Sequence, residues 1–176
     1  IQCMSIGFLT DEKTPMIWRG PMVTSAIKTF TQQVNWKDLD FIIVDMPPGT
    51  GDTQLTFSQS IEMSGAIIVS TPQEVALLDV KRGIKMFDKL GVKILGLIDN
   101  MSSFTGDDGK KYAIFGEGGV KRTAEEFNKE FLAEIPINPE IGKSGDQGKP
   151  IVESNPENKI SQIYLDLAKK IKSIYL

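Results

Sequence analysis

The 176-residue chain contains no histidine, which removes the side chain that most often serves as a general base or as a nitrogen ligand to a metal. Its single cysteine, Cys3, has no second thiol with which to form a disulfide within the chain. No apolar run reaches the length of a membrane span and no signal peptide is visible, so the cytoplasm is the expected compartment. The 20 basic and 23 acidic residues give a net charge of -3 without a long basic run, which disfavours non-specific binding to nucleic acid.

The chain does have enough apolar material for a core. Hydrophobic residues make up 40% of it, and its length predicts a single domain over residues 1–176. It opens on the apolar run IQCMSIGFL without a starting methionine, and this pattern is typical of a sequence that begins inside a domain.

Apolar runs and amphipathic segments alternate along the chain. Three short runs without polar alternation are expected to be strands buried on both faces of a parallel sheet: FIIV (41–44), AIIVS (66–70) and ILGLI (94–98). Between the last two, apolar residues recur at helical spacing and Gly91 ends the pattern. A further strand is expected at FLAEIPI (131–137) and a final amphipathic helix near the carboxyl end. This order predicts an α/β fold, a doubly wound and mostly parallel sheet flanked by helices.

The stretch FIIVDMPPGTGD (41–52) carries the chemistry. Ligands of such sheets bind beyond the carboxyl ends of the strands, and Asp45 follows the first apolar run directly. A carboxylate at that place is predicted to hold magnesium, often through a water. Two prolines stiffen the exit, and Gly49 and Gly51 leave room for backbone amides to approach an anionic group. Asp52 either caps a helix that begins there or lies near an attacking water, and the residues leave both readings open.

Six motifs together resemble one family. They are DMPPGTGDTQL, MIWRGPM (16–22), STPQEVALLDVKRGIKMF (70–87), DNMSSF (99–104), IFGEGG (114–119) and GDQGKPIV (145–152). In order and spacing they look like the Mrp/ApbC-type iron–sulfur cluster carriers, which are P-loop ATPases of the MinD-like group. The resemblance covers nearly the whole chain. It implies ATP and magnesium as cofactors, a homodimer, and apoprotein recipients together with cluster-assembly proteins as partners, with neither nucleic acid nor membrane among them.

The resemblance also implies roles for single residues. Asp45 matches the family's Walker B acid, and with Asp52 it is the expected catalytic pair. The loop that senses the γ-phosphate matches Pro48, Gly49, Thr50 and Gly51. Asn100 matches the asparagine that pairs with the adenine edge, for which an amide carrying both donor and acceptor is suited; a plain strand-end turn is the alternative. The loop that lies against the base matches Pro136, Ile137 and Asn138, and here too a simple turn is the alternative.

Two features of the family are missing from the printed chain. No G-x-x-x-x-G-K-[ST] phosphate loop occurs, and the family's loop would precede residue 1, so an N-terminally truncated P-loop domain that binds ATP weakly is expected. The C-x-x-C pair that lets two subunits bridge an iron–sulfur cluster is also absent between NMS and IFG, so no cluster ligands are identified.

Two other functions remain compatible with the sequence. One is a positioning ATPase of the MinD or ParA kind, which would act on membrane or DNA. The other is a nucleotide-free module that only recruits partners. The leading prediction is an ATP-binding and ATP-hydrolysing cluster carrier, with the activity belonging to a complete protein.

Overall fold

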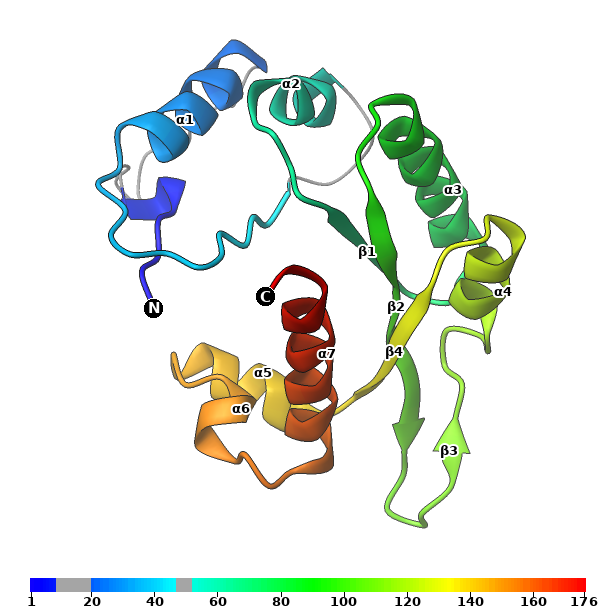
Figure 1. Ribbon diagram of the computed structural model, residues 1–176. Coiled ribbons are helices and arrows are strands. Elements are labelled where there is room, and N and C mark those ends of the chain that lie inside the picture. Colours follow the sequence, from blue (N-terminus) through cyan, green and yellow to red (C-terminus); the bar gives the residue numbers. More distant parts are fainter. Residues whose placement is uncertain (9–19, 47–51) are drawn as a thin grey trace. The chain divides into compact units, whose positions relative to one another are not determined.

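The computed structural model describes residues 1–8, 20–46 and 52–176 (Figure 1). The chain divides into two compact units, Ile1–Ser64 (unit 1) and Gly65–Leu176 (unit 2), and each is described by itself. The single domain expected over residues 1–176 stays a prediction.

Unit 1 is built from short helices. Its elements are the 3-10 helix η1 (Ile6–Phe8), α1 (Gly20–Gln32) and α2 (Asp52–Ser60), and α1 packs against α2. Ile27 of α1 and Phe57 of α2 are buried. The segment after α1 is held by side chains: Trp36 Nε1 donates a hydrogen bond to the Phe30 carbonyl at 2.8 Å.

The apolar run 41–44 does not form the buried strand expected from the sequence. Residues 41–46 have no regular secondary structure, and the exposed fraction reaches 57% at Ile42 and 83% at Ile43. A strand needs a neighbour that pairs its N–H and C=O groups and elements that cover its faces. The described part of unit 1 contains no strand, so this run has nothing to pair with there. The prediction was wrong because the apolar pattern of a run shows its own tendency to form a strand but not whether a neighbouring strand is there to pair with it.

Unit 2 contains a sheet of four strands with β2 at its centre. The strands are β1 (Ala66–Ser70), β2 (Ile94–Thr105), β3 (Lys111–Tyr112) and β4 (Phe131–Ile137). Both β1 and β4 run parallel to β2, while β3 forms an antiparallel hairpin with the far end of β2. The predicted strands at 66–70 and 131–137 are confirmed with these bounds, and β2 extends beyond the predicted run 94–98.

Burial follows each strand's position in this sheet. In the central strand, Leu97 and Ile98 are buried, as expected for a strand covered on both faces. In β1 the expectation was wrong, because no residue is fully buried and Val69 is 55% exposed. The reason is that β1 pairs with β2 alone among the described strands and so lies at an edge of the sheet of unit 2.

Helices cover both sides of the sheet. They are α3 (Glu74–Lys89), α4 (Gly119–Glu126), α5 (Pro139–Asp146), α6 (Ile151–Ser154) and α7 (Lys159–Tyr175). Figure 1 shows α3 and α4 on one side of β2 and β4, and α7 on the other. The core lies under α3 and α4 and consists of Leu77, Val80, Ile84, Leu97, Val120 and Ala124. Gly91, with φ +70°, follows the end of α3 in the left-handed conformation that stops a helix.

Charged and polar side chains fix the helix ends. Lys129 and Asp88 form an ion pair of 2.7 Å between the segment after α4 and the end of α3. At the start of α7, the Asn158 side chain accepts a hydrogen bond from Ile160 N at 2.9 Å. Such a cap satisfies one of the amides that a helix leaves unpaired in its first turn. None of the helices in the described ranges is long and apolar enough to cross a membrane.

Candidate functional site

The predicted magnesium ligand and phosphate loop belong to unit 1. Asp45 lies in the extended segment 41–46, and its side chain is exposed rather than packed into the interior. The expectations for Pro48, Gly49, Thr50 and Gly51 fall outside the described residues. The helix α2 begins at Asp52, where the sequence left open a helix cap or a place near an attacking water, and the second of these stays a prediction. The exposed carboxylate of Asp45 and the start of α2 are therefore the described part of this candidate site.

The predicted base-binding residues lie in unit 2, where the strand register brings them together. Asn100 of β2 stands opposite Ile135 of β4, immediately before Pro136. The Asn100 side chain is half-buried, and no described residue forms a hydrogen bond with its amide. An amide that is partly shielded from water and not used by its neighbours is available to a ligand at the carboxyl end of the strands.

Asn138 is already used by the fold. Its side-chain oxygen accepts a hydrogen bond from Glu140 N at 2.8 Å, and Pro139 occupies the first turn of α5. The residue is thus the N-cap of α5, a common position for asparagine. Contact between the base and residues Pro136, Ile137 and Asn138 stays a prediction, and the cap gives the loop a fixed shape for it.

A bulge separates Asn100 from Phe104 within β2. Asn100 pairs with Ile135 and Phe104 pairs with Ile137, so residues 101–103 of β2 stand opposite Pro136 alone. Proline has no N–H to donate to the ladder, which explains why the pairing breaks at this point. Within the bulge, Met101 adopts a left-handed backbone conformation with a φ of +56°. This conformation is unfavourable by roughly 1–2 kcal/mol for a residue that has a Cβ. The side chain of Met101 is 43% exposed.

Asp99, next to Asn100, is a functional candidate that the sequence reasoning missed. It is only 1% exposed, and the register places it between Ser70 of β1 and Glu134 of β4. Among the described residues its Oδ1 has no hydrogen-bond partner. Burial, and secondarily the nearby Glu134 carboxylate, raise the pKa of Asp99 from its ordinary 3.8 to about 6. The available signal was an acid that directly continues the apolar run ILGLI.

The start of α4 packs closely on the end of β1. A Cβ added at Gly119 would lie 2.5 Å from the Pro72 carbonyl oxygen and 2.7 Å from Leu77 Cδ1. Only glycine fits this approach. The two glycines of IFGEGG that precede α4 and have positive φ, Gly116 and Gly118, lead the chain into this contact. The motif therefore has a packing role that its composition alone did not reveal.

The hairpin of β2 and β3 lies between NMS and IFG, where the resemblance led to the expectation of a cysteine pair. Asp108 at its tip accepts hydrogen bonds from Lys110 N at 3.0 Å and from the Tyr112 hydroxyl at 3.2 Å. The tip is thus closed by a carboxylate rather than by thiolates. The only cysteine of the chain, Cys3, is exposed in unit 1.

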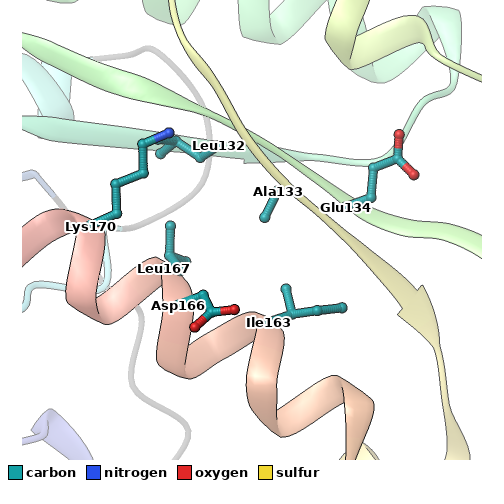
Figure 2. Close-up of a pocket in the computed structure, with 7 residues that line it drawn as sticks. All are labelled: Leu132, Ala133, Glu134, Ile163, Asp166, Leu167 and Lys170. Atoms are coloured by element: carbon teal, nitrogen blue, oxygen red, sulfur yellow. The ribbon is translucent and has the colours of Figure 1, made fainter.

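A cavity of about 290 Å³ lies between β4 and α7 (Figure 2). Leu132, Ala133, Ile163 and Leu167 form its apolar lining. In Figure 2 the Glu134 carboxylate points away from α7. The charged groups at its rim are paired within the unit, since Lys170 bonds to Glu130 and Asp166 to Lys169. Glu134 is thus the one charged lining residue for which no ion pair is found among the described residues.

The comparison with protein families decides the identity of this fold. The family model described as ParA, NUBPL iron-transfer P-loop NTPase, matches residues 1–172. The chain belongs to this family. The sequence-based assignment to P-loop proteins of the MinD-like group is thereby confirmed, as is the α/β fold class.

Members of the NUBPL/ParA family with curated names are closely similar. The "Iron-sulfur protein required for NADH dehydrogenase, mitochondrial" of Arabidopsis thaliana is 48% identical over 97% of this chain and 55% of its own length. The "Iron-sulfur cluster carrier protein" of Synechocystis is 48% identical over 97% of the chain and 49% of its length. The mouse "Iron-sulfur cluster transfer protein NUBPL" is 46% identical over 97% and 54%, respectively. The chain thus spans about half the length of these relatives.

Solved structures agree with the family. A nucleotide-binding protein of Archaeoglobus fulgidus, in complex with ADP, has a TM-score of 0.68 and 35% identity, covering 79% of this chain and 56% of that one. The MinD protein of Pyrococcus horikoshii, complexed with Mg-ADP, has a TM-score of 0.64 over 89% of this chain and 58% of its own. At 24% identity, the MinD likeness shows the shared fold alone.

Proposed function

We propose that this chain serves an ATP-dependent iron–sulfur cluster carrier, with the cluster as cargo and apoproteins as recipients. The observation that carries the proposal is the 48% identity to a named cluster carrier over 97% of the chain. The MinD-like positioning role has only the shared fold in its favour, and the nucleotide-free module has no observation that favours it.

The adenine is assigned to the carboxyl ends of the strands of unit 2. In unit 1, the exposed Asp45 would hold magnesium through a water, and residues 48–51 would meet the γ-phosphate. Asp52 would lie near the attacking water. The free amide of Asn100 would bind the adenine edge, with Pro136, Ile137 and Asn138 against the base. Magnesium, when bound, neutralises charge on the β- and γ-phosphates during transfer.

The ATPase activity of the chain as printed should be very low. It contains no lysine-bearing glycine loop, and that loop supplies most ligands of the β- and γ-phosphates. Isothermal titration with ATP and magnesium is expected to give only weak, millimolar-range binding, reduced further by Asn100→Ala. Micromolar affinity of the chain, or an Asn100→Ala variant that binds as the wild type does, would contradict this assignment.

The cargo does not fit a bridging site made by this chain. One cysteine per chain gives two thiolates in a dimer, and the hairpin tip offers hard carboxylate oxygens, which are poor ligands for iron–sulfur clusters. Anaerobic reconstitution followed by iron and sulfide analysis should give negligible cluster on the isolated chain and on Cys3→Ser alike. A stable cluster on the wild-type chain that Cys3→Ser removes would refute the absence of a bridging site.

A homodimer completes the proposal, and light scattering with and without ATP measures it. Assembly that depends on ATP is expected of a carrier that alternates between two arrangements. A monomer at all nucleotide concentrations would contradict the dimer. The cytoplasmic compartment stays a prediction.

A further inference from the structure

The backbone at Met101 is unusual for its residue type. Three described residues other than glycine have a positive φ: Asp38 at +45°, Met101 at +56° and Asn128 at +51°. Aspartate and asparagine tolerate this conformation because their short polar side chains can form hydrogen bonds locally. Asn128 also follows the C-cap of α4, where left-handed residues are common, and its N–H bonds to Glu125 O at 3.1 Å. Neither explanation applies to methionine.

The bulge by itself does not require a methionine. Its cause is Pro136, which leaves β2 without a partner N–H, and glycine would adopt the left-handed turn with less strain. Strained residues that persist at a ligand-binding edge suggest a function for the side chain. The Met101 side chain is 43% exposed, so packing inside the unit does not account for it either.

The position of Met101 suggests what it touches. It follows Asn100 directly and lies at the level of Pro136 in the strand register. Resting on the nucleotide function proposed above, we propose that Met101 packs its thioether on the face of the purine ring whose edge Asn100 binds. Methionine is flexible and polarisable, and its sulfur makes favourable contacts with aromatic rings. Pro136, across the bulge, supplies a second apolar surface at the same level.

A contact to the edge of the base and a contact to its face depend differently on whether the base is adenine or guanine. Asn100 recognises donors and acceptors on the ring edge, so Asn100→Ala should weaken ADP more than GDP. Met101 contacts only the ring face, so Met101→Gly should weaken both nucleotides alike, by about fivefold. Met101→Leu keeps an apolar side chain and should stay within about twofold of the wild type. Asn128→Gly is the matched control, because it changes a left-handed residue away from the site.

Nuclear magnetic resonance of the methionine methyl groups gives a direct readout. The Met101 signal is assigned by its loss in Met101→Leu, and Met86 of α3 serves as internal reference. ADP or GDP at millimolar concentration is expected to move the Met101 methyl upfield, because the ring current of a stacked base acts on it, and to leave Met86 in place. A merely structural role of the bulge would not produce this shift.

The results separate the two proposals. If Asn100→Ala weakens ADP but Met101→Gly does not, and the Met101 methyl does not move, the inference on Met101 is overturned while the base site stands. If neither variant changes nucleotide affinity, or the wild type shows no ADP response at either residue, the base site itself is wrong and the inference falls with it.

Discussion

The buried carboxylate of Asp99 makes a specific prediction about stability and pH. Its pKa rises from 3.8 to about 6 in the folded protein, first because it is buried and then because Glu134 is near. Between these two values the folded state keeps a proton that the unfolded chain has already released. Stability therefore falls as the pH rises from about 4 to above 6, which is the opposite of the usual behaviour of a paired aspartate. Each pKa unit is worth about 1.4 kcal/mol, so the whole loss is about 3 kcal/mol.

Asp99→Asn removes this titration and keeps the shape of the side chain. The amide brings a cost of its own, since it too lacks partners, but that cost does not depend on pH. The free energy of unfolding of the variant minus that of the wild type should therefore increase by about 3 kcal/mol between pH 4 and pH 8. For Glu134→Gln, the same difference in the free energy of unfolding should also increase with pH, but by a smaller amount. The reason is that Glu134 is the second cause of the raised pKa of Asp99.

The assay is urea unfolding at several pH values, followed by the resonances of residues in the core of unit 2 such as Ile84 and Leu97. These probes report unit 2 without a contribution from unit 1. A difference between Asp99→Asn and the wild type that stays constant from pH 4 to pH 8 would show that Asp99 titrates normally. The argument from burial and the unpaired Oδ1 would then be wrong.

Three further tests of the structure of unit 2 use the same unfolding assay. Gly119→Ala should lower the free energy of unfolding by about 1–3 kcal/mol, because the added Cβ would lie 2.5 Å from a backbone oxygen. Gly142 of α5 is the control: its added Cβ would meet nothing within 4 Å, so Gly142→Ala should be neutral or slightly stabilising. Equal losses for the two variants would refute the close approach at Gly119. Asn158→Ala should cost about 1 kcal/mol through the lost cap of α7, and no loss would mean that water replaces it. Met101→Gly should be more stable than Met101→Ala by roughly 1 kcal/mol, because both variants lack the methionine side chain but only alanine has a Cβ that is strained at a positive φ. The reverse order of stability would contradict the left-handed backbone at this position.

Elements with a strong local pattern could be predicted from the sequence. The spacing of Leu77, Val80 and Ile84 indicated α3, and these residues are buried in the core. The seven residues of FLAEIPI form β4 with the predicted bounds. In both cases the information lies within the element itself, as periodicity or as a run of apolar and β-branched residues between breakers.

The features that escaped prediction depend on partners distant in sequence. The run 41–44 has a strand's composition but no neighbour in the described part of its unit. The bulge at Met101 is caused by Pro136, which is 35 positions away in the chain and adjacent only through the strand register. The raised pKa of Asp99 likewise comes from burial within the folded unit and from the charge of Glu134 on β4. For the candidate site, the sequence indicated Asn100. It offered for Asp99 only an acid that continues an apolar run, and it gave no sign of the left-handed backbone at Met101.

The two strands that flank β2 in parallel, β1 and β4, differ in the features that discourage a further strand from pairing with them. On β4, Pro136 interrupts the row of donors and Glu134 places a charge on the strand, and both features discourage a further strand from joining. On β1 the residues are AIIVS, with Val69 largely in solvent, and neither a proline nor a charge interrupts them. Within unit 2, the edge of β1 therefore carries neither of the two features that discourage a further strand at β4, so a strand would add to this sheet more readily beside β1 than beside β4.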